Sequence, residues 1–397
     1  MEHASRLIID GGGCELRITE PTKQLLDVRK STHVIVRNLA VDFEVSPHTQ
    51  GWVTGVDREA GWFTVELNSE YPDLDQPQFH QADYKWAFIK NRDNPVAFKE
   101  GTEFRLFLKR WSRIGEHRYK LEVQHKETLN TVEQGDPFVQ ISRIDGALFV
   151  AHHCQDLTFL DLRLYASSNA LFATSYCDRS SFVRIKAMPR EGSWLTAGAD
   201  GCFNFSGREG SWVEECHFEA LGDDNLIVKG YPAYCINAVD ASTFDLVHAA
   251  VRFERLQPTV GFYQDLEEDD KWQVQPGDTL TVMDPLGRAI AARPVVVEVE
   301  KTDRGVRVCV DRSIRGLRAG VDYEESLTFF SEDCCLSGFV VKNNFFRSAV
   351  RFGLLLKSHD GLVEGNHFEG HSEQATAMEN NCQEFNGIPY NLLIRNN

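Results

Sequence analysis

Three aspartates stand at a spacing that could bring their carboxyl groups together. Counted in residues, the interval from Asp200 to Asp223 is 23 and that from Asp200 to Asp224 is 24, and glycines flank both segments. If the chain advances by one structural repeat over that interval, the three carboxylates lie on one exposed turn face. Carboxylates this close cannot all ionise freely, so at least one pKa is raised. Cleavage of a glycosidic bond requires a carboxylic acid with a raised pKa beside an ionised carboxylate that acts as base.

The repeat that this interval needs is visible in the strand pattern. An apolar strand followed by charged or amide residues recurs along the chain. The positions taken as equivalent are Val36, Leu160, Val183, Val213, Val341, Val363 and Ile394. Counted in residues, the successive intervals are 124, 23, 30, 128, 22 and 31. Four of these intervals match one coil of a right-handed parallel β-helix, whereas the short strands of a β-sandwich recur about every 8–12 residues.

The two long intervals each exceed one coil by about 100 residues, which indicates two inserted domains. Alternating strands with turn signals and little helical periodicity predict that both are small antiparallel barrels. The expected fold class is therefore all-β: a right-handed parallel β-helix with two inserted β-barrels. The expected segments are 1–43 for the first coils, 44–145 for the first barrel, 146–231 for the catalytic coils, 232–333 for the second barrel and 334–397 for the last coils.

Composition disfavours several classes of partner. The 42 basic and 59 acidic residues among 397 leave a net charge of −17, which repels phosphate backbones and disfavours nucleic acid. No run of 18 apolar residues exists, so no membrane span is expected. No basic and then apolar leader precedes Leu7, so no signal peptide is expected either. A neutral ligand, or a cation held by carboxylates, fits this charge better.

The cysteines predict packing and not chemistry. None of the ten forms a CxxC pair, and their spacing does not match a zinc site. Cys154, Cys177 and Cys202 follow one another at nearly equal intervals, close to one coil, which predicts a ladder of small buried side chains. Asn and Phe residues after the strands likewise predict inward Asn ladders and aromatic stacks.

Several segments resemble one known family of enzymes. Residues 198–207 read Gly-Ala-Asp-Gly-Cys-Phe-Asn-Phe-Ser-Gly, and residues 220–225 read Ala-Leu-Gly-Asp-Asp-Asn. These runs resemble family 110 of the glycoside hydrolases, the α-1,3-galactosidases. Further segments that fit the family are 7–16, 33–43, 353–357, 363–370 and 391–397. The resemblance spans nearly the whole chain, including inserts at matching places.

The resemblance implies an exo-acting, inverting enzyme that releases galactose from terminal α-1,3-linked galactosides. Its partner is then an oligosaccharide or polysaccharide that ends in galactose, and no cofactor or metal is expected. By similarity, Asp200, Asp223 and Asp224 are the catalytic carboxylates, with the acid and base roles left open. The family also implies an exported or periplasmic location for a full-length form.

Three further residues are candidates for substrate binding. Arg351 lies ten residues past Val341, as Asp223 lies ten past Val213, so it is expected to stack over the carboxylates and bind sugar hydroxyls. Glu384 stands where the family shows an acidic residue before the final strand. Trp194 could offer an aromatic platform for a sugar face. The alternatives are an ordinary turn arginine, a surface glutamate and a core tryptophan.

Other functions remain open at the level of sequence. A polygalacturonase-like hydrolase shares the Asp…Asp-Asp arrangement, but no Gly-His-Gly is present, and the only Arg-Ile-Lys, which begins at Arg184, precedes the aspartates. A calcium-dependent lyase and a non-catalytic, carbohydrate-binding β-helix are further alternatives. Whether two chains pair as a homodimer is also open.

Overall fold

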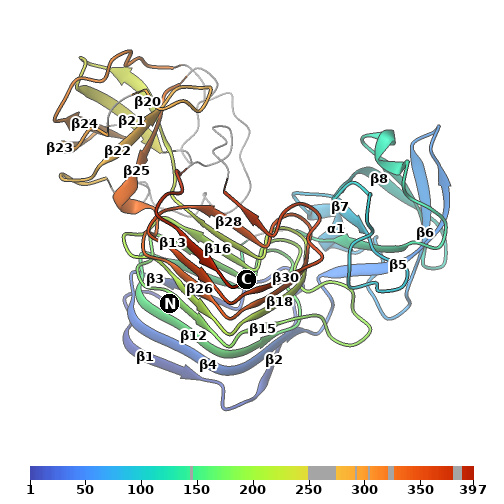
Figure 1. The fold of residues 1–397 in the computed structure, drawn as a ribbon. Helices are drawn as coiled ribbons and strands as arrows, with labels where there is room; N and C mark the ends of the chain where they lie inside the picture. Colours follow the sequence, from blue (N-terminus) through green and yellow to red (C-terminus); the bar gives the residue numbers. More distant parts are fainter. Residues whose placement is uncertain (144–145, 249–273, 291–292, 303–304, 321–325, 379–386) are drawn as a thin grey trace.

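Nearly all regular secondary structure in the described residues is β-strand, arranged in both parallel and antiparallel sheets (Figure 1). This computed structural model describes residues 1–143, 146–248, 274–290, 293–302, 305–320, 326–378 and 387–397. Within those ranges, no helix is long and apolar enough to cross a membrane.

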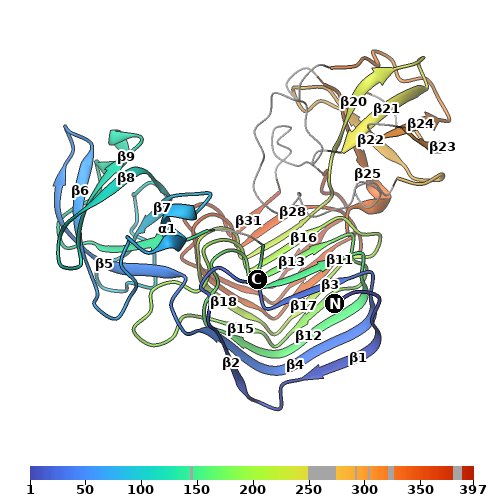
Figure 2. The same cartoon turned by 180° about the vertical axis from the view of Figure 1, so that it is seen from behind.

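Two parallel sheets form the centre of the molecule, and the chain alternates between them (Figures 1 and 2). The thirteen-stranded sheet contains β1 (Ser5–Asp10), β2 (Glu15–Ile18), β4 (Thr32–Phe43), β12 (Gln155–Leu164), β14 (Ser181–Val183), β15 (Lys186–Ala187), β17 (Trp212–Glu214), β18 (His217–Leu221), β26 (Val340–Lys342), β27 (Phe345–Ala349), β29 (Leu362–Glu364), β30 (His367–Glu369) and β32 (Leu393–Arg395). The seven-stranded sheet contains β3 (Leu26–Arg29), β11 (Phe149–His152), β13 (Phe172–Ser175), β16 (Cys202–Phe205), β19 (Leu226–Lys229), β28 (Leu354–Lys357) and β31 (Thr376–Ala377). We call each stretch of chain that contributes to both sheets a coil.

The register between coils corrects two of the equivalences expected from the sequence. The stacked inward positions are Val36, Phe159, Phe182, Val213, Val341, Val363 and Ile394. Leu160 and Val183 are therefore one residue out of register, and both face away from the core. Because side chains alternate along a strand, a one-residue slip moves a side chain to the other face of the sheet. Adjacent apolar pairs such as Phe159-Leu160 hide this slip in the sequence.

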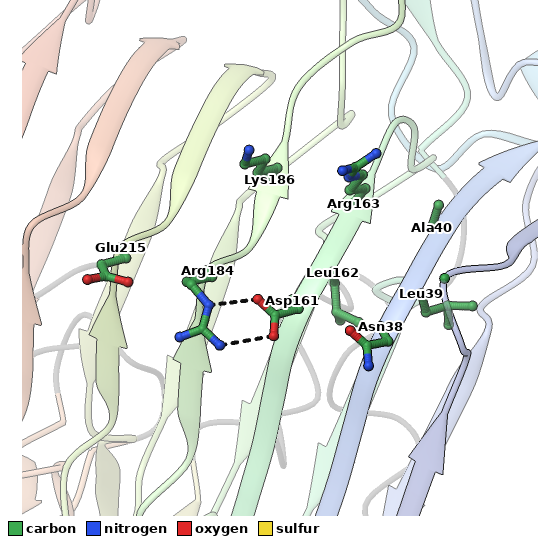
Figure 3. A pocket seen from close by; sticks show the side chains of 10 residues that line it. Asn38, Leu39, Ala40, Asp161, Leu162, Arg163, Arg184, Lys186 and Glu215 are labelled. Carbon is green, nitrogen blue, oxygen red and sulfur yellow. Dashed lines mark hydrogen bonds and ion pairs between the residues drawn. The ribbon is translucent and has the colours of Figure 1, made fainter.

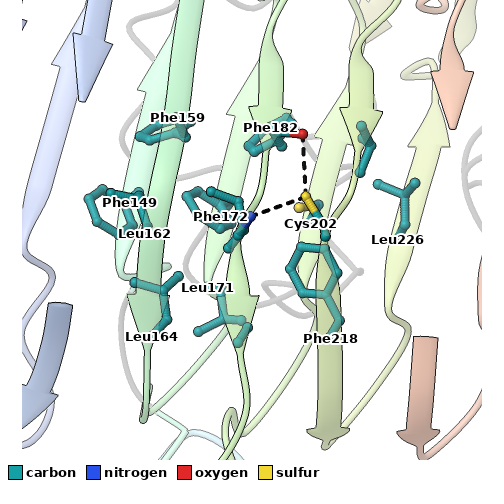
Figure 4. Close-up of a cluster of buried hydrophobic side chains, with 14 of the residues drawn as sticks. Phe149, Phe159, Leu162, Leu164, Leu171, Phe172, Phe182, Cys202, Phe218 and Leu226 are labelled. Atoms are coloured by element: carbon teal, nitrogen blue, oxygen red, sulfur yellow. Dashed lines mark hydrogen bonds between the residues drawn. The ribbon is translucent and has the colours of Figure 1, made fainter. Parts of the chain in front are cut away.

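Like residues stack inside the coils (Figure 4). The rings of Phe149 and Phe172 stack 5.2 Å apart, and those of Phe159 and Phe182 stack 5.5 Å apart. The predicted Asn ladder is formed by Asn344, Asn366 and Asn397, whose side-chain amides bond one another and the neighbouring backbone.

The cysteine ladder is shorter than the sequence suggested. The backbone N–H of Cys154 donates to Cys177 Sγ at 3.4 Å, so these two side chains stack. Cys202 pairs in register with Phe172 instead and belongs to a different row. The prediction that Cys202 continues the ladder was therefore wrong. Strand register places the next coil 30 residues on, from Phe172 to Cys202, so the position that continues the row of Cys177 is Gly207, five residues after Cys202.

The first insert is a closed antiparallel barrel. Its elements are β5 (His48–Asp57), β6 (Trp62–Leu67), α1 (Pro77–Gln81), β7 (Trp86–Ile89), β8 (Leu106–Gly115), β9 (Arg118–Val123), the 3-10 helix Lys126–Leu129 and β10 (Pro137–Ile141). The barrel packs against the coils through a separate apolar cluster that joins Trp86, Phe88 and Ile141 to Trp194 and Val350. This junction brings one end of the barrel to the coil turns that carry the three aspartates.

The second insert contributes a six-stranded antiparallel sheet on the other side of the coils (Figures 1 and 2). Its described elements are β20 (Ala233–Ala238), β21 (Thr243–His248), β22 (Leu280–Met283), β23 (Val296–Lys301), β24 (Val306–Val310) and β25 (Thr328–Ser331), followed by the 3-10 helix Glu332–Cys334. Arg208, in the turn between two coils, forms an ion pair with Asp278 at 2.9 Å and so connects this insert to the coils.

Candidate active site

The three aspartates meet where two successive coils turn from one parallel sheet to the other. Asp200 lies two residues before the start of β16, and Asp223 and Asp224 lie between β18 and β19. Each carboxylate offers an oxygen within 4.8 Å of an oxygen from the other two. The coil interval thus stacks Asp200 on Asp224, and the backbone N–H of Gly201 donates to the carbonyl of Asp224 at 3.0 Å.

Glycines allow the turns to approach this closely. A Cβ atom on Gly222 would lie 2.5 Å from the carbonyl oxygen of Gly198, and one on Gly201 would lie 2.4 Å from the carbonyl oxygen of Asn225. Both distances are far shorter than any real Cβ contact. The flanking glycines seen in the sequence are therefore required by backbone packing between coils.

The carboxylates are buried, which corrects the expectation of an exposed turn face. Asp200 is 3%, Asp223 8% and Asp224 1% exposed. The cover comes from the first barrel, whose Arg105 forms an ion pair with Asp223 and donates to the carbonyl of Gly222 at 3.5 Å. Coil spacing brings the three groups together but carries no information about what covers them.

Three arginines surround Asp223. Besides the Arg105 pair, Arg143 Nη1 lies 3.7 Å from Asp223 Oδ2, and Arg351 Nη1 lies 3.8 Å from Asp223 Oδ1. Arg105 and Arg143 also lie over the ring of Trp86, at 4.2 and 4.8 Å from its centroid. Burial alone would raise the pKa of Asp223, but the three positive charges outweigh burial and lower it. Asp223 is therefore ionised.

The other two carboxyl groups are shifted the opposite way. Burial and then the charge of Asp223 raise the pKa of Asp200 to about 7. Burial, followed by the charges of Asp223 and Asp200, raises the pKa of Asp224 well above its ordinary value. The site thus places an ionised Asp223 beside a protonated Asp224 and beside Asp200, which gains or loses its proton near pH 7. Acid–base catalysis uses such a pair of ionised and protonated groups.

The hydrogen bonds show which oxygens are available for chemistry. Asp200 Oδ1 accepts from the backbone N–H of Asp224 at 3.2 Å, and Asp224 Oδ1 accepts from the backbone N–H of Phe352 at 3.1 Å. Asp224 Oδ2 and Asp223 Oδ1 are buried and accept no hydrogen bond from any described residue. One oxygen of Asp224 and one of Asp223 therefore have acceptor positions that no described residue fills.

The raised pKa of Asp200 makes the folded state sensitive to pH. Its folded pKa lies above its unfolded value of 3.8, so the favourable contribution is complete below pH 3.8 and is lost as pH rises through about 7. Replacing Asp200 with Asn removes this titration and keeps the Oδ1 acceptor. We expect the Asp200→Asn variant to melt a few °C higher than the parent at pH 8, with a smaller difference at pH 5.

Circular dichroism melts at the two pH values measure this effect. Asp93→Asn, at an exposed carboxylate of the first barrel, serves as the control and should show no pH-dependent difference. A lower melting temperature for Asp200→Asn at pH 8 would contradict the proposed burial of a neutral carboxyl group.

The residues predicted to bind substrate have different positions. Arg351 stacks over Asp223, as the ten-residue offset predicted. Trp194 is 9% exposed and packs with Leu195, Trp86 and Phe88, with its ring edge-on to Trp52 at 5.2 Å. Its position is thus the core position that the sequence left as an alternative, although it borders the apolar cluster under Arg105. Glu384 lies outside the described residues.

Sequence reasoning missed three charged residues of the site. Arg105 and Arg143 come from the first barrel, at no regular interval from the aspartates, so no spacing signal pointed to them. Glu373 lies one coil beyond Arg351, and its Oε1 is 3.8 Å from Arg351 Nε. Arg351 and Glu373 are separated in the chain by about one coil, as Asp200 and Asp223 are. A search by coil spacing could therefore have found Glu373.

Comparison with known proteins leaves the site to be interpreted from its own geometry. That geometry comprises three stacked carboxyl groups with opposed pKa shifts, three surrounding guanidinium groups and two carboxyl oxygens without hydrogen-bond partners among the described residues. No protein-family model matches the chain, and no curated protein matches its sequence.

Proposed function

We propose that the chain is a glycoside hydrolase that releases galactose from terminal α-1,3-linked galactosides with inversion. The proposal includes a right-handed parallel β-helix of the kind that family 110 uses, with which the alternating parallel sheets are compatible. The observation that carries the proposal is the buried trio Asp200, Asp223 and Asp224 with one low and two raised pKa values. The choice of galactose and linkage rests on the sequence resemblance.

In the proposed mechanism, Asp224 is the general acid. The proton on Asp224 Oδ2 passes to the glycosidic oxygen as the bond from that oxygen to the anomeric carbon breaks. Asp223 is the general base, which accepts a proton from the water that attacks the anomeric carbon. Asp200 holds the backbone of Asp224 through its Oδ1 atom. Solvent then returns the proton from Asp223 to Asp224.

The separation of the carboxylates makes the stereochemistry a direct test. The oxygens within 4.8 Å are closer than the roughly 6.5–9.5 Å between carboxyl groups in inverting enzymes and nearer the roughly 5–5.5 Å of retaining enzymes. Inversion therefore requires the bound sugar and water to separate Asp223 from Asp224. Retention would instead make Asp223 a nucleophile.

We expect wild-type protein to release galactose from α-1,3-galactobiose, with β-galactose as the first-formed anomer. Proton NMR spectra recorded during the first minutes distinguish the two anomers before mutarotation mixes them. β-1,4-Galactobiose serves as the matched substrate control and should not be cleaved. α-Galactose as the first product would replace inversion with retention, and sugar binding without turnover would indicate a carbohydrate-binding protein.

A polygalacturonase-like hydrolase is the second candidate, and the arginines favour it. Arg105, Arg143 and Arg351 place three positive charges against one ionised carboxylate, an arrangement that also suits the carboxylate of a uronic acid. New reducing ends from polygalacturonate, with none from galactobiose, would select this function. The same arginines disfavour a calcium ion among the carboxylates, and with it a calcium-dependent lyase, whose product would absorb ultraviolet light.

A further inference from the structure

A second site lies on the outer face of the thirteen-stranded sheet, in a groove of about 580 Å³ (Figure 3). It runs across β4, β12 and the segment between β14 and β15. Charged side chains line it, namely Asp161, Arg163, Arg184, Lys186 and Glu215. None of the three proposed catalytic aspartates lines this groove, so it is separate from the site described above.

Two of the cations in the groove have no carboxylate partner. Arg163 and Lys186 are both exposed, and neither forms an ion pair with any described residue. Two other basic side chains on the same face pair with carboxylates. Arg184 pairs with Asp161 at 2.7 Å and, along the same sheet, Lys342 pairs with Glu214 at 3.0 Å. Figure 3 shows Arg163 and Lys186 side by side, pointing to the same side of the sheet.

These two cations begin a straight row of outward side chains. Strand register places Arg163 beside Lys186, Lys186 beside His217, His217 beside Phe345 and Phe345 beside His367. The Phe345 ring lies 4.7 Å from each of its two histidine neighbours and is stacked on His367. Parallel strands lie about 4.8 Å apart, so the row is a linear array of two cations followed by three rings, of which His217 meets Phe345 edge-on.

We propose that this row binds a linear acidic glycan, one that carries sulfate or carboxylate groups. The unpaired cations attract the acidic groups, and the ring edges that point outward from the sheet offer apolar contact to the following sugars. A row that crosses several coils fits an extended polymer better than a compact ligand. A nucleic acid is the other polyanion that two cations could attract, and a competition experiment distinguishes the two.

Dextran sulfate and unmodified dextran form a matched pair of probes, since they differ in sulfate alone. We expect wild-type protein to bind dextran sulfate in isothermal titration calorimetry and to bind dextran much more weakly. The double variant Arg163→Gln/Lys186→Gln should bind dextran sulfate roughly tenfold more weakly, because it loses two charged contacts. Its rate of galactose release from galactobiose should match that of the parent, which separates failure of this proposal from failure of the proposed activity.

The control variant is Lys109→Gln/Arg118→Gln, which removes the same two charges from exposed positions on the first barrel. It should retain full affinity for dextran sulfate. Equal binding of dextran and dextran sulfate, or equal loss of affinity in the two double variants, would overturn the proposal. Competition by a single-stranded oligonucleotide as strong as that by dextran sulfate would assign the row to nucleic acid instead.

Discussion

The Asp224→Asn variant is expected to release galactose from α-1,3-galactobiose about 10³-fold more slowly than the parent. Asparagine keeps the Oδ1 atom that accepts from Phe352 N–H but has no proton to give from the other position. Because Asp224 is buried and protonated in the parent, the neutral amide should leave the fold intact. Circular dichroism and initial rates of galactose release measure the two effects.

The leaving group distinguishes an acid from a base. The nitrophenolate of a nitrophenyl α-galactoside leaves with little need of protonation. Asp224→Asn should therefore lose far less activity on this substrate than on galactobiose. Asp223→Asn, which removes the proposed base, should lose activity on both substrates to a similar degree. The reverse pattern would exchange the two roles, and full activity in both variants would remove the trio from catalysis.

The Arg105→Gln and Arg143→Gln variants are expected to move the acid limb of the kcat/KM profile to higher pH by about one unit each. The proposed base must be ionised, so activity falls as pH drops through the pKa of Asp223. Each arginine lowers that pKa, and removing either raises it. Near the midpoint of the parent's acid limb, each variant should therefore show several-fold less activity, with recovery at higher pH.

The control is Arg113→Gln, which removes a charge from the same barrel where Arg113 pairs with Asp73 and Asp75. Its pH profile should overlay that of the parent. A uniform fall in kcat/KM with an unmoved acid limb would mean that Arg105 and Arg143 bind substrate without tuning Asp223.

Much of the parallel architecture was predictable because each coil repeats one local pattern. Apolar strands that recur once per coil must stack to bury their inner faces, and the spacing of the apolar residues in the sequence indicates this stacking. The coil interval placed Asp200 against Asp224, and the shared ten-residue offset from Val213 and Val341 placed Arg351 against Asp223. The details that failed were offsets along the chain: one residue for Leu160 and Val183, and five residues for Cys202. Several neighbouring apolar residues fit the pattern equally well, so only strand pairing decides between them.

The sequence by itself thus determined that the three aspartates belong to adjacent coils and share one turn region. Only the tertiary structure decided that they are buried, that the pKa of Asp223 is lowered and that the pKa values of Asp200 and Asp224 are raised. The ionisation of Asp223 depends in part on Arg105 and Arg143, which the first barrel carries to the coil turns from a distant part of the chain. The pKa of a buried carboxyl group depends on charges near it in space. No local periodicity links an inserted barrel to the coils, so the sequence does not indicate which barrel residues supply those charges.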